Sequence, residues 1–383
     1  MDSRDQIHIS VRTLVEFILR GGSIDNRRKV SPENAMQEGS RIHRMIQRKM
    51  GAEYQAEVPL KLVVAYDEFD ILIDGRADGI ISEQNGQVTV DEIKGIYKDL
   101  AYLKEPYEVH LSQAKCYAYI YAKDHNCNEI RVRMTYCNID TEEIKYFHFC
   151  YTYEALSHWF ERIMDEYRKW AEFERDWKNA RRESIRRLAF PFPYRKGQKE
   201  LASQVYRTIY HGKRLFIEAP TGAGKTLSTV FPAVKAVGEG LADKLFYLTA
   251  KTITGTVASE AFSILRKAGL SYKTVSITAK EKICFMEETE CNPLACVYAD
   301  GHYDRINDAI FDLLTSEDEY SRETICKYAE KHRVCPFEMC LDLTLFADAV
   351  ICDYNYVFDP NVYLRRFFSE GVRGDYLFLV DTE

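Results

Sequence analysis

The sequence feature that most constrains the fold is the octapeptide Ala-Pro-Thr-Gly-Ala-Gly-Lys-Thr at 219–226. It follows the apolar run 215–217 and precedes a segment rich in alanine and valine, an order that predicts a strand, a glycine loop and a helix. Glycines at this spacing let backbone N–H groups curl around a phosphate, and the dipole of the following helix favours the same negative charge. Only Ala219 departs from the usual pattern, which has glycine there. We therefore expect a nucleotide phosphate site in a parallel α/β domain that begins near residue 194.

Within this loop the residue types predict distinct roles. Lys225 would neutralise the β- and γ-phosphates, and the Thr226 hydroxyl would hold Mg²⁺. The loop backbone would contact the phosphates through Thr221, Gly222, Ala223 and Gly224. Tyr-Arg-Lys-Gly-Gln at 194–198 and Leu-Thr-Ala-Lys-Thr at 248–252 flank the loop, and together these motifs resemble superfamily-2 helicases. That resemblance implies that Gln198 reads the adenine of ATP and that the second motif touches a nucleic-acid backbone.

The cysteines are unevenly distributed. Seven of the eleven lie between Cys284 and Cys352, whereas Cys116, Cys127, Cys137 and Cys150 have apolar or strand-like surroundings and are expected to be plain buried side chains. The spacing Cys284-x6-Cys291-x4-Cys296-x38-Cys335 suits a cubane cluster, whose irons each need one thiolate. Zinc is the alternative, although structural zinc sites favour tighter cysteine pairs. Cys340 could replace Cys335 as the fourth ligand, and the spacing alone does not decide between them; Cys326 and Cys352 would be spare.

The position of these cysteines resembles the XPD and DinG kind of iron–sulfur helicase, as does Val-Ile-Cys-Asp-Tyr-Asn-Tyr-Val-Phe-Asp-Pro at 350–360. The resemblance covers about residues 194–381 and implies an ATP-driven helicase domain with a 4Fe–4S insert at about 280–340. Asp381 matches the first acid of that family's Asp-Glu-Ala-His motif, but Thr382 stands where its glutamate belongs. We therefore expect a chain cut short at this motif, without a second motor domain, that binds ATP better than it hydrolyses it and does not unwind DNA alone.

The N-terminal part carries a second constellation. Asp78 lies in Gly-Arg-Ala-Asp-Gly at 75–79, and Glu92 and Lys94 lie in Val-Asp-Glu-Ile-Lys at 90–94. Alternate residues of a strand share a face, so Glu92 and Lys94 should lie together, with Asp91 on the opposite face and dispensable. Two carboxylates can share Mg²⁺ or Mn²⁺, and a nearby lysine can orient water or stabilise a pentavalent phosphate.

This order resembles the PD-(D/E)xK nucleases, a restriction-endonuclease-like αβ fold. Three further matches point to the RecB-like branch: His43 as an added metal ligand, and Gln113 and Tyr117 one helical turn apart. Glu38 is a further possible ligand. The resemblance implies metal-dependent cleavage of DNA, with Asp78, Glu92, Lys94, Gln113 and Tyr117 as active-site residues.

Periodicity and turn residues predict the layout of the 383 residues. We expect a nuclease-like domain at 1–152, a charged helix and proline-punctuated linker at 153–193, and the ATPase domain at 194–383. The net charge of −7 excludes a uniformly basic nucleic-acid coat but not a local basic groove. No window approaches the ~20 apolar residues of a membrane span, and Met-Asp-Ser-Arg-Asp is not a signal peptide, so we expect a cytoplasmic protein.

Two functions are consistent with these patterns. The first is a nuclease tethered to an ATP-dependent helicase module that processes or repairs single-stranded or branched DNA. The second is a non-catalytic DNA-binding or regulatory fragment with a degenerate nuclease domain. The intact Asp78, Glu92 and Lys94 favour the first, and the altered motif at 381–383 favours the second for the helicase part.

Overall fold

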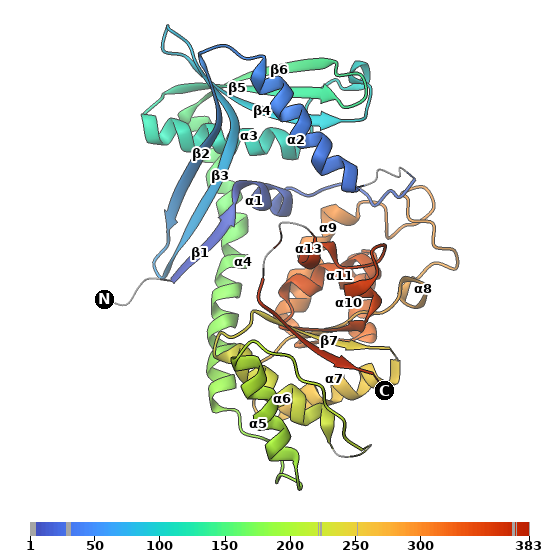
Figure 1. Cartoon of the computed structure of the whole chain (residues 1–383). Helices are drawn as coiled ribbons and strands as arrows, with labels where there is room; N and C mark the ends of the chain where they lie inside the picture. Colours follow the sequence, from blue (N-terminus) through green and yellow to red (C-terminus); the bar gives the residue numbers. More distant parts are fainter. Residues whose placement is uncertain are drawn as a thin grey trace. The chain divides into compact units, whose positions relative to one another are not determined.

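The computed structural model describes residues 5–27, 32–220, 222, 224–250, 252–369, 372 and 374–382, with side chains at 32–36 and 252–253 left undescribed. The chain forms two compact units (Figure 1). The N-terminal unit holds the residues up to Gly21 and Asn26–Arg175, and the C-terminal unit holds Gly22–Asp25 and the residues from Asp176 onward. The helix α4 (Tyr153–Arg187) is continuous through the change from one unit to the other.

The N-terminal unit is built on a mixed six-stranded sheet. Its strands are β1 (Asp5–Ser10), β2 (Tyr54–Ala65), β3 (Phe69–Ser82), β4 (Val88–Ile96), β5 (Glu129–Asn138) and β6 (Ile144–Thr152). β1 pairs in parallel with the first half of β3, and β4 pairs antiparallel with its second half, while β2 runs antiparallel along most of β3. The parallel pair β4–β5 brings the acidic segment of β4 into the middle of the sheet.

The helices of this unit are α1 (Val11–Ile18), α2 (Pro32–Arg48), the single turn η1 (Leu100–Tyr102) and α3 (Glu108–His125). Alternate residues of β4 face different helices. Ile93 packs with Ile42 and Ile46 of α2 in one apolar cluster, whereas Lys94 contacts Gln113 of α3. The two-residue period of the strand therefore separates a packing face from a polar face.

The C-terminal unit has a parallel five-stranded sheet in the order β11-β7-β10-β8-β9. The strands are β7 (Lys244–Thr249), β8 (Thr274–Ser276), β9 (Glu319–Tyr320), β10 (Ala349–Asp353) and β11 (Tyr376–Asp381). The helices that precede or join them are α5 (Gln198–Tyr210), α6 (Lys225–Gly238), α7 (Thr252–Lys267), α8 (Lys280–Ile283), α9 (His302–Ser316), α10 (Arg322–His332), α11 (Pro336–Phe346), α12 (Asn355–Phe358) and α13 (Arg365–Phe368). Strands alternating with helices around a parallel sheet are the RecA-like arrangement expected for this part of the chain.

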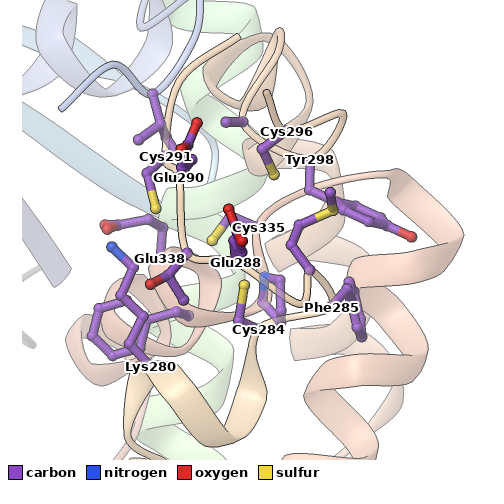
Figure 2. A pocket seen from close by; sticks show the side chains of 16 residues that line it. Lys280, Cys284, Phe285, Glu288, Glu290, Cys291, Cys296, Tyr298, Cys335 and Glu338 are labelled. Atoms are coloured by element: carbon purple, nitrogen blue, oxygen red, sulfur yellow. The ribbon is translucent and has the colours of Figure 1, made fainter. Parts of the chain in front are cut away.

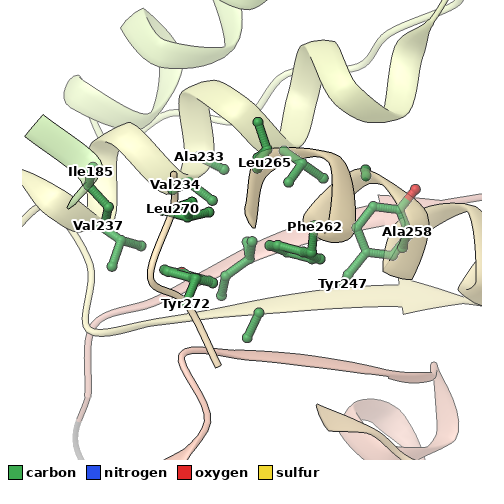
Figure 3. Packing of buried hydrophobic residues seen from close by; sticks show 14 of the residues in the cluster. Ile185, Ala233, Val234, Val237, Tyr247, Ala258, Phe262, Leu265, Leu270 and Tyr272 are labelled. Atoms are coloured by element: carbon green, nitrogen blue, oxygen red, sulfur yellow. The ribbon is translucent and has the colours of Figure 1, made fainter. Parts of the chain in front are cut away.

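The core of this unit lies between the sheet and the helices α6 and α7. Figure 3 shows Val234 and Val237 of α6, Phe262 and Leu265 of α7, and Tyr272 packed over the strands. Each of these side chains is at most 4% exposed. Burial of this apolar layer holds α6, and with it the loop that precedes α6, in register with the ends of the strands.

One predicted strand does not form. The apolar run 215–217 was expected to lead into the glycine loop as a strand, but residues 213–220 have no regular structure, and Leu215, Phe216 and Ile217 are exposed. A strand needs a neighbour for its N–H and C=O groups. Among the described residues none pairs with this run, and β11 forms the edge of the sheet. None of the described helices is long and apolar enough to cross a membrane.

Candidate functional sites

The first candidate site gathers around Asp78 of β3 and Glu92 of β4. The Ile93 N–H donates to Asp78 Oδ2 at 2.7 Å, and His43 Nδ1 of α2 lies 3.2 Å from Asp78 Oδ1. On the other side, Lys94 Nζ lies 2.8 Å from Glu92 Oε1. The structure therefore brings together these four predicted residues from three elements.

The surroundings of the Glu92 carboxylate fit a bound cation. Its side chain is 1% exposed, and its Oε2 atom has no hydrogen-bond partner in the described part of the chain. Burial, reinforced by the charge of Asp78 and opposed by Lys94, raises the pKa of Glu92 to about 8. A buried carboxylate oxygen without a partner is costly, and a hard divalent ion is the ligand that satisfies it. The donor set of Asp78, Glu92 and His43 therefore fits Mg²⁺ or Mn²⁺.

The surroundings of His43 favour the protonated form of its ring. Burial opposes protonation of its ring, but the hydrogen bond and charge of Asp78 outweigh burial, so the pKa of His43 is raised. Its neutral nitrogen would be available once a bound cation took over the charge of Asp78.

Gln113 and Tyr117 of α3 support the lysine. Gln113 Oε1 accepts a hydrogen bond from Lys94 Nζ at 2.9 Å, and Tyr117 is hydrogen-bonded to Gln113 in turn. Tyr117 passes so close to Gly75 that a Cβ atom there would lie 2.7 Å from its hydroxyl oxygen. Glycine at this position of β3 therefore makes room for the tyrosine that positions Gln113.

Two glutamates lie differently from the sequence-based expectation. Glu38 pairs with Arg41 on its own helix at 2.8 Å, and is not among the residues that the structure groups around Asp78. Glu57 of β2 was not expected, yet its carboxylate lies with His43 and Asp78 in a group whose ligand atoms are all within 4.8 Å of one another. A glutamate inside a strand gives no sequence signal for such a position.

Asp91 is predicted to be dispensable for cleavage, and this stays a prediction. It does belong to a different network from Glu92, but it is fully buried and accepts hydrogen bonds from Arg133, Thr135 and Tyr54. A buried ion pair of this kind cannot lose one partner without a large cost.

The second candidate site is the glycine loop before α6. Gly222 and Gly224 have φ of +80° and +73°, the left-handed region that glycine adopts without strain. Gln198 is buried against this loop, so a Cβ atom on Gly224 would lie 2.2 Å from its Nε2. Lys225 Nζ donates to the Ala219 carbonyl at 2.9 Å across the loop. Thr221 and Ala223 lie outside the described residues.

The acidic end of β11 faces the start of α6. Tyr247 of β7 donates its hydroxyl to Asp381 Oδ2 at 2.7 Å and is also hydrogen-bonded to Thr226. Tyr354 donates to the Asp381 carbonyl. The predicted Mg²⁺ partners Thr226 and Asp381 therefore share one tyrosine, although they are far apart in sequence.

The third candidate site is a pocket lined by four cysteines. Cys284, Cys291, Cys296 and Cys335 all line it, together with Lys280, Phe285 and Ile24 (Figure 2). All four thiols are free. Cys340 does not line the pocket; it is fully buried and its Sγ lies 3.7 Å from the Ser276 carbonyl. The structure therefore groups Cys335, and not Cys340, with the other three.

Lys280 adds a positive charge to this pocket. Burial opposes its protonation, but a hydrogen bond to Cys291 and nearby negative charge outweigh burial, so the pKa of Lys280 is raised. Four sulfur donors around one space fit a soft metal centre, and a cation beside them would offset the charge of the thiolates.

These features define a class of protein: an αβ domain with a carboxylate–lysine site, joined in one chain to a parallel-sheet domain with a phosphate-type loop. Comparison with known families gives the particular assignment. Residues 14–197 match the family model of the PD-(D/E)XK nuclease superfamily, and residues 266–372 match that of DEAD_2. One chain therefore holds a region that matches the PD-(D/E)XK nuclease superfamily and a region that matches DEAD_2.

Solved structures also match. One titled "XPD_Helicase" is 18% identical, with 49% of this chain and 32% of that chain covered and a TM-score of 0.34. Another, titled "Truncated XPD", is 18% identical, with 48% and 51% covered and a TM-score of 0.32. The chain spans about a third to a half of the length of these two structures. The search of curated proteins found no match.

Proposed function

We propose that this chain is a metal-dependent DNA nuclease joined to an ATP-binding helicase module, acting on single-stranded or branched DNA. The observation that carries the proposal is the clustering of Asp78, Glu92 and Lys94, in which the buried Glu92 Oε2 has no hydrogen-bond partner among the described residues. The nuclease-like domain is placed at 1–152, the connecting helix and linker at 153–193, and the helicase domain at 194–383.

Each residue of the nuclease site has a role in the proposed reaction. Asp78 and Glu92, with His43, would hold Mg²⁺ or Mn²⁺, which supplies a polarised phosphate and a more acidic water. Water adds to phosphorus and one phosphodiester P–O bond breaks, leaving a phosphate monoester and a hydroxyl. Lys94 stabilises the charge that develops on the phosphate oxygens. Gln113, fixed by Tyr117, holds the Lys94 ammonium in place.

The helicase module is proposed to bind ATP and Mg²⁺ through Gln198, Gly222, Gly224, Lys225, Thr226 and Asp381. The left-handed glycines and the shared contact of Tyr247 with Thr226 and Asp381 support this assignment. Thr221 and Ala223 complete the loop in sequence.

We propose a 4Fe–4S cluster on Cys284, Cys291, Cys296 and Cys335. The common pocket and the raised pKa of Lys280 beside the thiols support it. Zinc remains the alternative metal for four thiolates, and the metal content of anaerobically purified protein decides between them.

The test of the nuclease proposal is cleavage of labelled single-stranded and flapped DNA with added Mg²⁺ or Mn²⁺. Cleavage should need the metal, should not need ATP, and should fall at least ~100-fold in Asp78→Asn, the scale for removing one group from an electrostatic site. Glu53→Gln removes an exposed acid just before β2 and is the matched control. Tight DNA binding without any metal-dependent cleavage would instead indicate a non-catalytic DNA-binding fragment.

A further inference from the structure

Glu57 has an unusual backbone for a residue in the middle of a strand. Its φ is +55°, the left-handed region, although it lies within β2. The residues on either side, Ala56 and Val58, pair with Gly79 and Ala77 of β3 in a single register, and the pair Glu57–Asp78 is missing between them. Left-handed non-glycine residues are strained, and such strain is concentrated at ligand sites. The distortion of β2 therefore falls directly opposite Asp78.

The side chain of Glu57 points into the same group as two proposed metal ligands. The ligand atoms of His43, Glu57 and Asp78 all lie within 4.8 Å of one another. Gln47, one turn after His43 on α2, donates from Nε2 to Glu57 Oε1 and to the Asp78 carbonyl, both at 2.9 Å. Arg76 Nη1 lies 3.6 Å from Glu57 Oε2. Gln47 therefore fixes the carboxylate of Glu57 beside Asp78.

A second, independent observation points to a cation site in this region. Glu92 is 1% exposed, and its Oε2 has no hydrogen-bond partner within the described residues. The charges of Asp78 and His43 both act on Glu92, so these groups share one environment. His43, Glu57 and Asp78 form one group, Glu92 interacts with two of its members, and within the described residues Arg76 pairs with Glu57 and Lys94 with Glu92.

We propose that Glu57 is a metal ligand of the nuclease site, and that His43, Glu57 and Asp78 together hold a divalent cation. This inference rests on the proposed nuclease function and extends it by naming a further ligand. One imidazole nitrogen with carboxylate oxygens suits Mn²⁺ better than Mg²⁺, which prefers an all-oxygen shell. The cation compensates for the strained backbone that places Glu57 opposite Asp78.

The experiment is calorimetric titration of the full chain with MnCl₂ alone, without DNA. Glu57→Gln keeps the shape of the side chain and an acceptor for Gln47, yet should weaken Mn²⁺ binding at least about tenfold, because losing even an indirect partner of a metal ligand costs about that much. Glu53→Gln lies four residues earlier, removes the same charge, and should bind Mn²⁺ as the wild type does.

Glu57→Gly guards against a loss caused by misfolding. Glycine accepts the left-handed backbone, so the metal-free variant should melt at a higher temperature than the wild type. The same variant should gain less stability from Mn²⁺, because it binds the ion more weakly. A purely structural role for Glu57 would leave the Mn²⁺-induced shift unchanged.

The outcomes separate this inference from the proposed function. If Glu57→Gln and Glu57→Gly bind Mn²⁺ like the wild type while Glu92→Gln weakens binding, the role of Glu57 is overturned and the nuclease site stands. If the wild type binds no Mn²⁺, or if neither Glu57→Gln nor Glu92→Gln changes its affinity, both the inference and the proposed metal site are wrong.

Discussion

Replacing Asp91 by asparagine should destabilise the N-terminal unit strongly without removing a proposed metal ligand. The Asp91 carboxylate is fully buried and accepts from Arg133 Nε at 2.8 Å, Arg133 Nη2 at 2.9 Å, Thr135 Oγ1 at 2.5 Å and Tyr54 Oη at 3.0 Å. Arg133 is itself 14% exposed, so the variant leaves a nearly buried guanidinium without a counter-ion.

Breaking a buried ion pair by removing one partner costs about 3–5 kcal/mol. Because the asparagine amide oxygen can still accept one hydrogen bond, we expect about 3 kcal/mol for Asp91→Asn. For a cooperative unit of this size that corresponds to a fall in melting temperature of about 6–12 °C.

Thermal unfolding followed by circular dichroism measures this change, with Glu53→Gln as the control that removes an exposed acid just before β2 in the same unit. A melting temperature within about 1 °C of the wild type would refute the argument, since it would mean that Asp91 is hydrated or unpaired in solution. Replacing the whole pair, with Asp91→Leu and Arg133→Met together, should recover part of the loss.

Three further predictions concern the other sites. Because the pKa of Glu92 is raised to about 8 in the fold, its protonated form contributes stability that is full below its ordinary value of 4.5 and is lost as the pH rises through 8. The melting temperature of the metal-free wild type minus that of Glu92→Gln should therefore fall from pH 5 to pH 8.5. A difference that does not change with pH would contradict the buried position of Glu92. Lys225→Ala should abolish ATP binding in an equilibrium assay, since it removes the ammonium group proposed to bind the phosphates. Unchanged ATP affinity in the variant would exclude the loop as the ATP site. ATP hydrolysis by the wild type should be slow because Thr382 follows Asp381. Cys335→Ser should bleach the absorbance of anaerobically purified protein and lower its iron content, whereas Cys340→Ser should not, and bound zinc in place of iron would overturn the cluster assignment.

Period-two alternation was a good guide to the polar face of β4. It predicts that Glu92 and Lys94 share a face and that Asp91 does not, and the structure has Lys94 in contact with Glu92 while Asp91 pairs with Arg133. What alternation could not show is that both faces of this strand are buried. The loss of stability on changing Asp91 could not be predicted from the sequence, because it depends on which side chains pack against the opposite face of the strand.

Other features depend on contacts that a sequence does not contain. Glu57 sits in a left-handed kink, and a glutamate in a strand-like segment gives no hint of that conformation. The run 215–217 is apolar enough for a strand, yet a strand forms only where a neighbour pairs with it. The sequence spacing allows either Cys335 or Cys340 to be the fourth cluster ligand, and only the packing of α11 distinguishes them. Cys335 precedes the first turn of this helix, and Cys340 is buried within it.

The central claim is that Glu92, and not its neighbour Asp91, belongs to a metal-dependent nuclease site. The most direct test compares Mg²⁺-dependent cleavage of single-stranded DNA by the wild type, Glu92→Gln and Asp91→Asn, at a temperature well below every melting transition. The structure predicts that Glu92→Gln remains folded and loses at least ~100-fold in cleavage rate, whereas Asp91→Asn is less stable but retains most of its cleavage. Equal losses in both variants, or full activity in Glu92→Gln, would contradict this assignment.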